Sequence, residues 1–467
     1  MDAKIGMCIL AAGKGTRMKW DSPKALAPLL GKSLIDYSLA CLEEFSQIEK
    51  CETFCGIVTG HLREQVESHV TKNHPTKKIH FAFQEVQSGT ADALKSYFSK
   101  IPDAHKTEFT VVICADTPLI EASDLTFMFN EFKNHEKLFA VCATFYAQNP
   151  TGYGRIVRGK NGFHIIEEKD ADLETKQIQE VNSGLYIFKT SFILDNLKNV
   201  STNNKAGEFY LTDLFQDHFE VKPLQFASGQ KFLGINTLTQ LEEVGKLLKK
   251  RQVQKLTESG VLFLDPESVY LESDVQIGQG SIIHPNVYCY GKTIIGERCI
   301  IEPGVVMKNA TLEKEVEILA HSYLEDAVIR THATIGPMAR IRPGSDVGEK
   351  SKIGNFVEIK KAKLDKGVKI SHLSYVGDAF IGEETNIGCG FITCNYDGAN
   401  KHITKIGKNS FIGSDCQAVA PIEIGDNAFV AAGTTITKNV PSDGFAIARA
   451  MISVKEGLAK KFIKKKS

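Results

Sequence analysis

A glycine-rich turn near the start of the chain has the residue types that bind phosphate groups. In "MCILAAGKGTRM" (7–18) an apolar run leads into Gly13, Gly15 and Arg17, and Lys24 follows in "DSPKAL". Backbone N–H groups of such a turn can approach phosphate oxygens closely, and the two side chains add positive charge. The turn lacks the spacing of a P-loop and the third glycine of a dinucleotide fingerprint. Taken alone, it predicts a phosphate loop of another kind or a plain tight turn.

Two further residues could do chemistry of a different kind. Asp116 ends an apolar strand expected over 109–116, where it is a candidate ligand or a plain strand cap. His372 lies in the polar stretch "EIKKAKLDKGVKISHLSYVGD". A histidine titrates in the range useful for removing protons, although a single histidine in a loop is more often only solvated.

The elements that position the glycine turn alternate between strand and helix patterns. Apolar runs over 109–116 and 138–146 predict buried strands, and 33–45 has apolar residues at helical spacing. This alternation predicts a doubly wound, mostly parallel α/β sheet of the Rossmann-like kind. Ligands of such sheets bind at the C-terminal ends of the strands, which is where the glycine turn falls.

The second half of the chain has a period of six residues. An aliphatic residue, usually followed by glycine, recurs every six positions, and some phases repeat after 18, as in Ile277 to Ile295, Ile335 to Ile353 and Ile406 to Ile424. This period predicts a left-handed parallel β-helix with aliphatic side chains inside. It breaks at 353–381 and at 387–406, and we expect loops on a binding face there.

Four segments follow from these patterns. We expect a doubly wound α/β domain over 1–236, an amphipathic connector helix over 237–258, the β-helix over 259–448 and a basic tail over 449–467. The tail is interpreted as a helix laid over an assembly, a contact to nucleotide phosphates or a frayed end.

Composition excludes several classes of protein. The 56 basic residues equal the 56 acidic ones, so no global charge attracts nucleic acid or an anionic membrane. No run approaches the roughly 20 apolar residues of a membrane span. Eleven scattered cysteines and the short "MDAKIGM" before the first strand predict reduced thiols and a cytoplasmic protein.

The motifs together resemble one enzyme family. "LAAGKGTRM", "PKAL", "ICADTPLI", "PTGYGRIV", "IIEEKDA", "EVNSGLY" and "GINTLTQL" occur in order, followed by "RIRPGSDVG", "GNFVEIKKAKL", "SHLSYVGDAFIG", "NIGCG" and "ITCNYDGANKHITKIG". The chain resembles the bifunctional N-acetylglucosamine-1-phosphate uridylyltransferases / glucosamine-1-phosphate N-acetyltransferases over nearly its whole length. The resemblance implies a cell-wall precursor enzyme that makes UDP-N-acetylglucosamine.

For the first half, the resemblance implies attack of a sugar phosphate on UTP with Mg²⁺ as cofactor. Asp116 and Asn236 would be the metal ligands, and oxygen ligands suit this ion. The implied UTP contacts are Leu10, Ala11, Ala12, Gly13, Arg17, Lys24 and Asn236, with Gln84, Gly89 and Thr90 as the uracil motif. The implied sugar contacts are Gly154, Glu167 and Asn182. Plainer roles are a solvated charge for Glu167, a turn for Asn182 and a helix cap for Asn236.

For the second half, the resemblance implies acetyl transfer from acetyl-CoA, with His372 as the base. Glucosamine 1-phosphate would contact Arg342, Lys360, Tyr375 and Asn386. Acetyl-CoA would contact Cys389, Asn395, Tyr396, Ser414, Ala432 and Arg449. Lys360 could instead belong to a solvated charge cluster, and Ser414 and Ala432 could be ordinary corner residues.

The chain departs from the family pattern at four positions. Cys114 and Ala115 replace an aromatic residue and a glycine before the metal aspartate, and the metal role of Asp116 is unaffected. Cys389 and Phe391 replace an alanine and a threonine. We expect Cys389 to be tolerated and the larger Phe391 to reshape the acetyl-CoA channel.

The resemblance also implies a homotrimer formed through the β-helix, with the acetyl site shared between subunits. Residues 350–363 and the C-terminal tail are candidates to reach a neighbour. Two other functions stay open: a single-activity sugar-1-phosphate nucleotidylyltransferase with a regulatory β-helix, and a non-catalytic scaffold. His372, Lys360 and "CNYDG" argue against the first. The set of Asp116, Asn236, Arg17 and Lys24 argues against the second.

Overall fold

The computed structural model describes residues 4–159 and 162–463. The chain divides into two compact units, 1–248 and 249–467. The boundary falls within α6 (Leu238–Glu258), the expected connector helix. Val244 of α6 packs into an apolar cluster of the first unit, and Val253 into the core of the second. None of the helices in the described residues is both long and apolar enough to cross a membrane.

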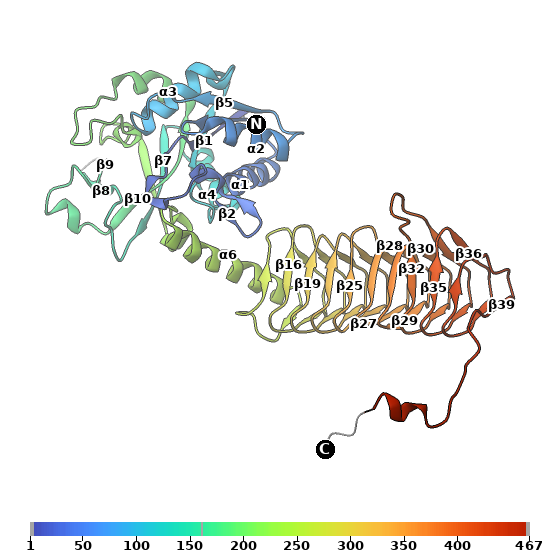
Figure 1. The fold of residues 1–467 in the computed structure, drawn as a ribbon. Helices are drawn as coiled ribbons and strands as arrows, with labels where there is room; N and C mark the ends of the chain where they lie inside the picture. The colour runs from blue at the N-terminus through green and yellow to red at the C-terminus, as the bar shows by residue number, and fades with distance from the viewer. Residues whose placement is uncertain (1–3, 160–161, 464–467) are drawn as a thin grey trace. The chain divides into compact units, whose positions relative to one another are not determined.

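The first unit is a twisted sheet with helices on both faces (Figure 1). Its strands run in the order β11-β7-β10-β6-β1-β4-β5. The strands are β1 (Lys4–Ala11), β4 (Glu52–Thr59), β5 (Ile79–Phe83), β6 (Phe109–Cys114), β7 (Ala140–Tyr146), β8 (Arg155–Arg158), β9 (Phe163–Ile166), β10 (Glu180–Lys189) and β11 (Val221–Phe226), with a hairpin of β2 (Pro28–Leu29) and β3 (Lys32–Ser33). The helices are α1 (Leu34–Glu49), α2 (Arg63–Asn73), α3 (Thr90–Lys100), α4 (Ala122–Asn134) and α5 (Thr190–Asn196).

Residue alternation along the strands explains the two helical layers. On β1, Met7 and Ile9 point into the core covered by α1, α2 and α4, whereas Cys8 points into the core covered by α3 and α5. Because successive side chains of a strand face opposite sides, a strand buried on both faces is apolar throughout. β1 pairs in parallel with β4 and β6, and β10 is antiparallel to its neighbours. The predicted α/β class is confirmed.

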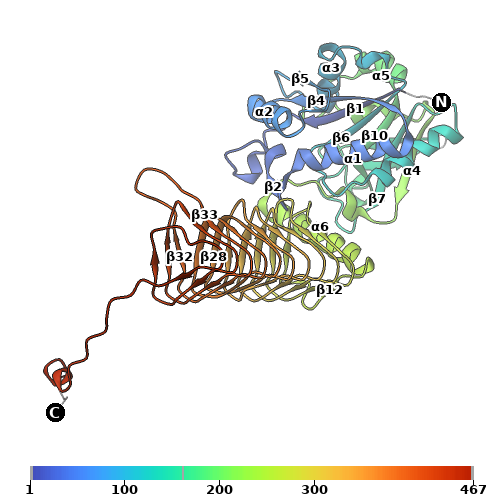
Figure 2. The same cartoon turned by 90° about the vertical axis from the view of Figure 1, so that its right-hand side faces the viewer.

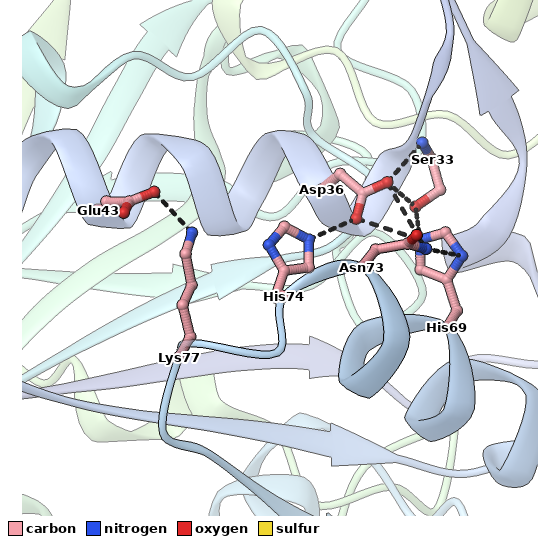
Figure 3. A network of polar contacts seen from close by, with 7 residues as sticks. All are labelled: Ser33, Asp36, Glu43, His69, Asn73, His74 and Lys77. Carbon is pink, nitrogen blue, oxygen red and sulfur yellow. Dashed lines mark hydrogen bonds and ion pairs between the residues drawn. The ribbon is translucent and has the colours of Figure 1, made fainter.

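A half-buried carboxylate joins α1 to α2 (Figure 3). Ser33 caps α1, and Asp36 accepts hydrogen bonds from the Ser33 backbone and hydroxyl at 2.9 and 2.7 Å. Two imidazoles from the end of α2 reach the same carboxylate, His74 at 2.9 Å and His69 at 3.1 Å. Burial alone would raise the pKa of Asp36, but the bonds from His74 and Ser33 hold that pKa below its usual value. The contacts fix the start of α1, which follows the segment that carries Lys24.

The second unit is a parallel β-helix of stacked coils (Figures 1 and 2). One ladder contains β12 (Leu262–Phe263), β15 (Ile282–Ile283), β18 (Ile300–Ile301), β21 (Glu317–Ile318), β24 (Thr334–Ile335), β27 (Lys352–Asn355), β29 (Lys369–His372), β31 (Asn386–Ile387), β34 (Phe411–Ile412), β37 (Phe429–Val430) and β39 (Phe445–Ala446). The other two faces contain β13 (Tyr270–Leu271), β14 (Gln276–Ile277), β16 (Tyr288–Tyr290), β17 (Ile294–Ile295), β19 (Val306–Lys308), β20 (Thr311–Leu312), β22 (Tyr323–Glu325), β23 (Val328–Ile329), β25 (Arg340–Ile341), β26 (Asp346–Val347), β28 (Glu358–Leu364), β30 (Tyr375–Ile381), β32 (Ile392–Cys394), β33 (Thr404–Ile406), β35 (Gln417–Val419), β36 (Ile422–Ile424) and β38 (Thr435–Ile436).

The register confirms the predicted repeat. Ile277 pairs with Ile295, Ile335 with Ile353, and Ile406 with Ile424. Each of these six side chains is buried in one continuous apolar core. The hexapeptide period therefore sets the β-helix as expected.

One of the two expected interruptions is wrong. The stretch 353–381 continues the coils, because Ile353 pairs with Ile370 and Ile359 pairs with Val376. Three of its inward residues, Ile359, Leu364 and Ile370, lack the following glycine, and Leu364 breaks the spacing of six, so the pattern hid a regular coil. The stretch 387–406 does contain a loop, between β32 and β33 (Figure 1).

Candidate functional site

A cavity of about 280 Å³ opens at the C-terminal ends of β1 and β6. Among its lining residues are those predicted from the glycine turn, the metal motif and the uracil motif: Leu10, Ala11, Ala12, Gly13, Lys24, Gln84, Gly89, Thr90 and Asp116. Gln87 and Glu208 also line it and were missed by sequence reasoning. The Gln87 amide donates to the Ala12 carbonyl at 2.6 Å, a contact that only the folded chain reveals.

The glycine turn has the form that close approach requires. Gly15 has a φ of 62°, and a Cβ there would lie 2.8 Å from the Cβ of Lys24. A larger residue would therefore be strained and would displace Lys24. Arg17 lies on the short 3-10 helix η1 (Thr16–Met18), is exposed, and is not part of the cavity wall.

In this cavity, two side-chain oxygens contact the ammonium group of one lysine. The Lys24 ammonium contacts the Asp116 carboxylate and donates to Asn236 Oδ1 at 2.8 Å. Asn236 is available for this contact because α6 is capped by its neighbours: Gln240 N–H donates to Thr237 Oγ1 at 3.2 Å. The backbone of Ile235 donates to the Asp116 carbonyl at 2.9 Å, which holds the two segments together.

These oxygens suit a magnesium ion. Carboxylate and amide oxygens are ligands of Mg²⁺, which keeps several water or phosphate oxygens besides its protein ligands. Among the described residues there is no cluster of three or more histidine, cysteine or acidic side chains of the kind that forms an all-protein metal cage. One carboxylate and one amide oxygen, those of Asp116 and Asn236, thus fit a hard divalent cation.

The uracil motif stands against the start of α3. Gln84 Nε2 donates to the Gly89 carbonyl at 3.1 Å and to the Asp92 carboxylate at 2.7 Å. Gly89 has a φ of 118°, and a Cβ there would lie 2.4 Å from the Phe209 carbonyl oxygen. Thr90 follows as the first residue of the helix. Glycine is thus required at position 89 by both backbone conformation and space.

The three predicted sugar contacts lie together. The Asn182 backbone donates to the Gly154 carbonyl at 2.9 Å, and a Cβ on Gly154 would lie 3.5 Å from the Glu167 carboxyl carbon. Thr212 donates to Glu167 at 2.9 Å. Burial raises the pKa of Glu167 above its usual value. The adjacent Glu168 pairs with Arg155 at 2.7 Å instead.

In the β-helix, four predicted residues form a column along one corner. Each follows an inward aliphatic residue by two positions, and those aliphatic residues pair in succession along one ladder. The four are His372, Cys389, Ser414 and Ala432. Backbone bonds from Asp415 to Cys389 and from Gly433 to Ser414 join neighbouring coils at this corner. The implied base and the implied acetyl-CoA contacts are therefore aligned along the coil axis.

His372 is exposed at this corner, at the end of β29. Its Nδ1 lies 3.1 Å from Asn355 Oδ1, on the preceding coil. An amide oxygen only accepts, so this contact keeps the proton on Nδ1 and leaves Nε2 as the acceptor. Asn355 was missed because its relation to His372 depends on the coil register.

A cationic cluster lies on the next face. Lys360 is buried and donates to Asp378 at 2.9 Å, which raises the pKa of Lys360. Asn395 contacts the same carboxylate, and its amide lies 3.5 Å from the Tyr375 hydroxyl. The ammonium of Lys401 lies beside that of Lys360, which lowers the pKa of Lys401. Lys360, Lys401 and Asp378 thus form one group of charges, of which Asp378 and Lys401 were not singled out from sequence.

The remaining predicted residues are less closely grouped. Arg342 donates to Glu358 at 2.8 Å. Asn386 lies on β31, paired with Phe411. Tyr396 is exposed in the inserted loop, and Arg449 is exposed beyond β39. A Cβ on Gly433 would lie 3.6 Å from the Arg449 Cδ, so Arg449 extends over that coil.

The family departures have clear places in the fold. Cys114 and Ala115 line the first cavity, and burial beside Asp116 raises the pKa of Cys114 to about 12. Phe391 is fully buried in the β-helix core, so its ring cannot line a surface channel. The expectation that Phe391 reshapes the acetyl-CoA channel is therefore wrong. Gly390 lies between the two residues with a φ of 77°, and the chain turns there so that position 391 faces the core, whereas Cys389 stays partly exposed.

Comparisons with known proteins cover both units. Residues 7–232 match the family described as Nucleotidyl transferase, 266–345 the GMPPB C-terminal domain, and 403–438 the hexapeptide repeat of succinyl-transferase. Proteins called Bifunctional protein GlmU are similar over 97% of this chain. That of Geotalea uraniireducens is 41% identical over 459 residues, with 98% of its length covered. Those of Shouchella clausii and Listeria monocytogenes are each 40% identical, with 98% and 97% of their lengths covered.

Proposed function

The chain belongs to the family of bifunctional GlmU proteins, and from this premise we propose that it catalyses two reactions. It acetylates glucosamine 1-phosphate with acetyl-CoA. It then transfers UMP from UTP to N-acetylglucosamine 1-phosphate, releasing pyrophosphate and giving UDP-N-acetylglucosamine. The observation that carries this proposal is the presence of two unrelated constellations, Lys24–Asp116–Asn236 in the first unit and Asn355–His372 in the second.

Uridylyl transfer requires two polyanions to meet, so alignment and charge neutralisation are the main tasks. Backbone N–H groups of the glycine turn and the exposed guanidinium of Arg17 bind the phosphates of UTP. Asp116 and Asn236 would hold the metal, and Lys24, which contacts both of these oxygens in the free chain, would then bind phosphate. Mg²⁺, when bound, neutralises phosphate charge.

The other contacts select the two substrates. Gln84, Gly89 and Thr90 read the uracil edge at the start of α3. Glu167 and Asn182, held near Gly154, bind hydroxyl or acetamido groups of the sugar. The raised pKa of Glu167 suits a carboxyl group that exchanges hydrogen bonds with a sugar rather than balancing a cation.

Acetyl transfer requires a neutral amine, because an ammonium has no lone pair. His372 accepts the proton at Nε2, the amine forms the amide bond, and the CoA thiolate leaves. Asn355 is a positioning residue that holds the imidazole in the required tautomer. Arg342, Lys360 and Lys401 bind the phosphate of glucosamine 1-phosphate, with Tyr375 and Asn386 as further sugar contacts. Acetyl-CoA lies along the column of Cys389, Ser414 and Ala432, near Asn395, Tyr396 and Arg449.

The proposal extends to assembly and location. The β-helix mediates a homotrimer in which a neighbouring subunit completes the acetyl site, and the enzyme works in the cytoplasm on small-molecule substrates. We propose domain limits of 1–236, 237–258 and 259–448, with a tail over 449–467. Apart from the half-buried Leu458, the described part of the tail is exposed, and it contains a short 3-10 helix, Leu458–Lys461. The last four residues of the tail lie outside the described part.

The test is a paired assay on the intact chain. One arm measures pyrophosphate release from UTP and N-acetylglucosamine 1-phosphate with Mg²⁺. The other measures thiol release from acetyl-CoA and glucosamine 1-phosphate. Both signals are expected. Pyrophosphate release alone would favour the single-activity nucleotidylyltransferase. If neither product were released, the non-catalytic scaffold would be favoured.

A further inference from the structure

Three phenylalanine rings form an exposed ladder on one face of the β-helix. Phe411, Phe429 and Phe445 occupy paired positions on β34, β37 and β39. Their ring centroids are 5.0 and 5.6 Å apart, with interplanar angles of 19° and 13°. The rings are 42%, 45% and 66% exposed. Rings stacked in this way cover one another's faces and leave the outer face of the terminal ring open.

The open face belongs to Phe445. β39 is the last strand of its ladder in the described chain, so no further coil covers this ring. Phe445 also has the largest exposed fraction of the three rings. A flat aromatic ligand placed on it would continue the stack as a fourth plane. The ladder therefore provides an aromatic platform at the end of the coil.

The platform lies beside the column proposed for acetyl-CoA. Phe411 and Phe429 precede Ser414 and Ala432 by three residues on the same coils. His372 begins the column, and Ala432 stands three coils further along, about 14 Å at the usual strand spacing. The acyl group and the nucleotide of acetyl-CoA are separated by the linear pantetheine arm. A nucleotide whose acyl group is at His372 must therefore bind several coils away.

A cation for the nucleotide phosphates stands in the same place. Arg449 follows Phe445 by four residues, and its side chain extends over Gly433, next to Ala432. Guanidinium groups pair well with phosphates. An aromatic plane and a guanidinium at the end of the proposed acyl path match the two chemical parts of an adenosine phosphate.

We infer that the adenine ring of acetyl-CoA stacks on the open face of Phe445, supported from below by Phe429 and Phe411. This inference rests on the proposed acetyl transfer and adds the residue that recognises the nucleotide end of its donor. Base–aromatic stacking is tolerant of ring identity and strong enough to affect affinity by an order of magnitude. The platform therefore favours the full coenzyme over truncated thioesters.

The test compares two donors. For Phe445→Ala, the KM for acetyl-CoA should rise about five- to tenfold, the lower part of the range for loss of one stacking contact. The KM for S-acetylpantetheine, which has no adenine, should stay within twofold of wild type. Phe445→Trp should keep the wild-type preference, because indole also stacks. Phe380→Ala is the matched control: Phe380 is 49% exposed and lies on a different face of the β-helix.

Several results would overturn the inference. An equal rise in KM for both donors would give Phe445 a structural role, and no change for either donor would leave adenine elsewhere. If Phe445→Ala altered the assembly state in sedimentation and affected both donors, a second copy of the chain would be the occupant of the ladder.

Calorimetric titration with coenzyme A separates this inference from the proposed reaction. Weaker binding to Phe445→Ala than to wild type, without thiol release by either, would refute the reaction and leave the platform standing. Equal coenzyme A binding by Phe445→Ala and wild type, with normal thiol release, would refute the platform and leave the reaction standing.

Discussion

The contact between Asn355 and His372 gives the sharpest quantitative expectation. Asn355→Ala removes the acceptor 3.1 Å from Nδ1, so the imidazole loses both its orientation and its fixed tautomer. A neutral hydrogen bond contributes about 0.5–1.5 kcal/mol, which corresponds to a fall of roughly 2- to 13-fold in kcat/KM for acetyl transfer. His372 is exposed, so no large additional packing loss is expected.

Thiol release measured across pH checks this reasoning, with Asn355→Asp as the companion variant. A carboxylate at position 355 stabilises the protonated imidazole, which cannot act as a base, so the acidic limb of the pH–rate profile should move to higher pH. Pyrophosphate release should be unchanged in both variants. Wild-type kcat/KM in Asn355→Ala, or an unmoved pH profile in Asn355→Asp, would refute the positioning role.

Three further expectations follow from the fold. Because burial raises the pKa of Glu167, the fold loses stability as pH rises from about 4.5, the usual value, through the raised pKa. Glu167→Gln should therefore raise the Tm at pH 7 by about 2–4 °C for each kcal/mol recovered, with no gain at pH 4, as measured by calorimetry. Phe391→Ala should lower the free energy of unfolding by about 3–5 kcal/mol in denaturant titrations, while the KM for acetyl-CoA stays within twofold. Lys24→Met should tighten binding of Mn²⁺ to the free protein by roughly fivefold, on the order of 1 kcal/mol, because no ammonium then competes for Asp116; weaker binding in calorimetry would contradict this competition.

The fold was predictable where one local pattern repeats. The spacing that pairs Ile277 with Ile295 is visible in the sequence, because each coil buries the same position of each hexapeptide. The stretch around Ile359 was misread because its coil keeps the inward aliphatic residues without the accompanying glycines. A search for aliphatic residues followed by glycine misses a coil that is specified only by its buried aliphatic residues.

The candidate sites were predictable only through their motifs. Nothing local links Asn355 to His372, which the stacking of coils joins, or Lys401 to Lys360, which meets it from the loop between β32 and β33. The same limit applies to the contact of Lys24 with Asn236, which are far apart in the chain and meet at the strand ends. Motifs in the sequence can identify individual site residues, but the contacts between these residues and the directions of their pKa shifts depend on the tertiary structure.

The independence of the two sites is the central claim, and two substitutions in the paired assay test it directly. Asp116→Asn should abolish pyrophosphate release and leave thiol release at the wild-type rate, and His372→Ala should do the reverse. A folded variant of either kind that lost both signals would contradict the account.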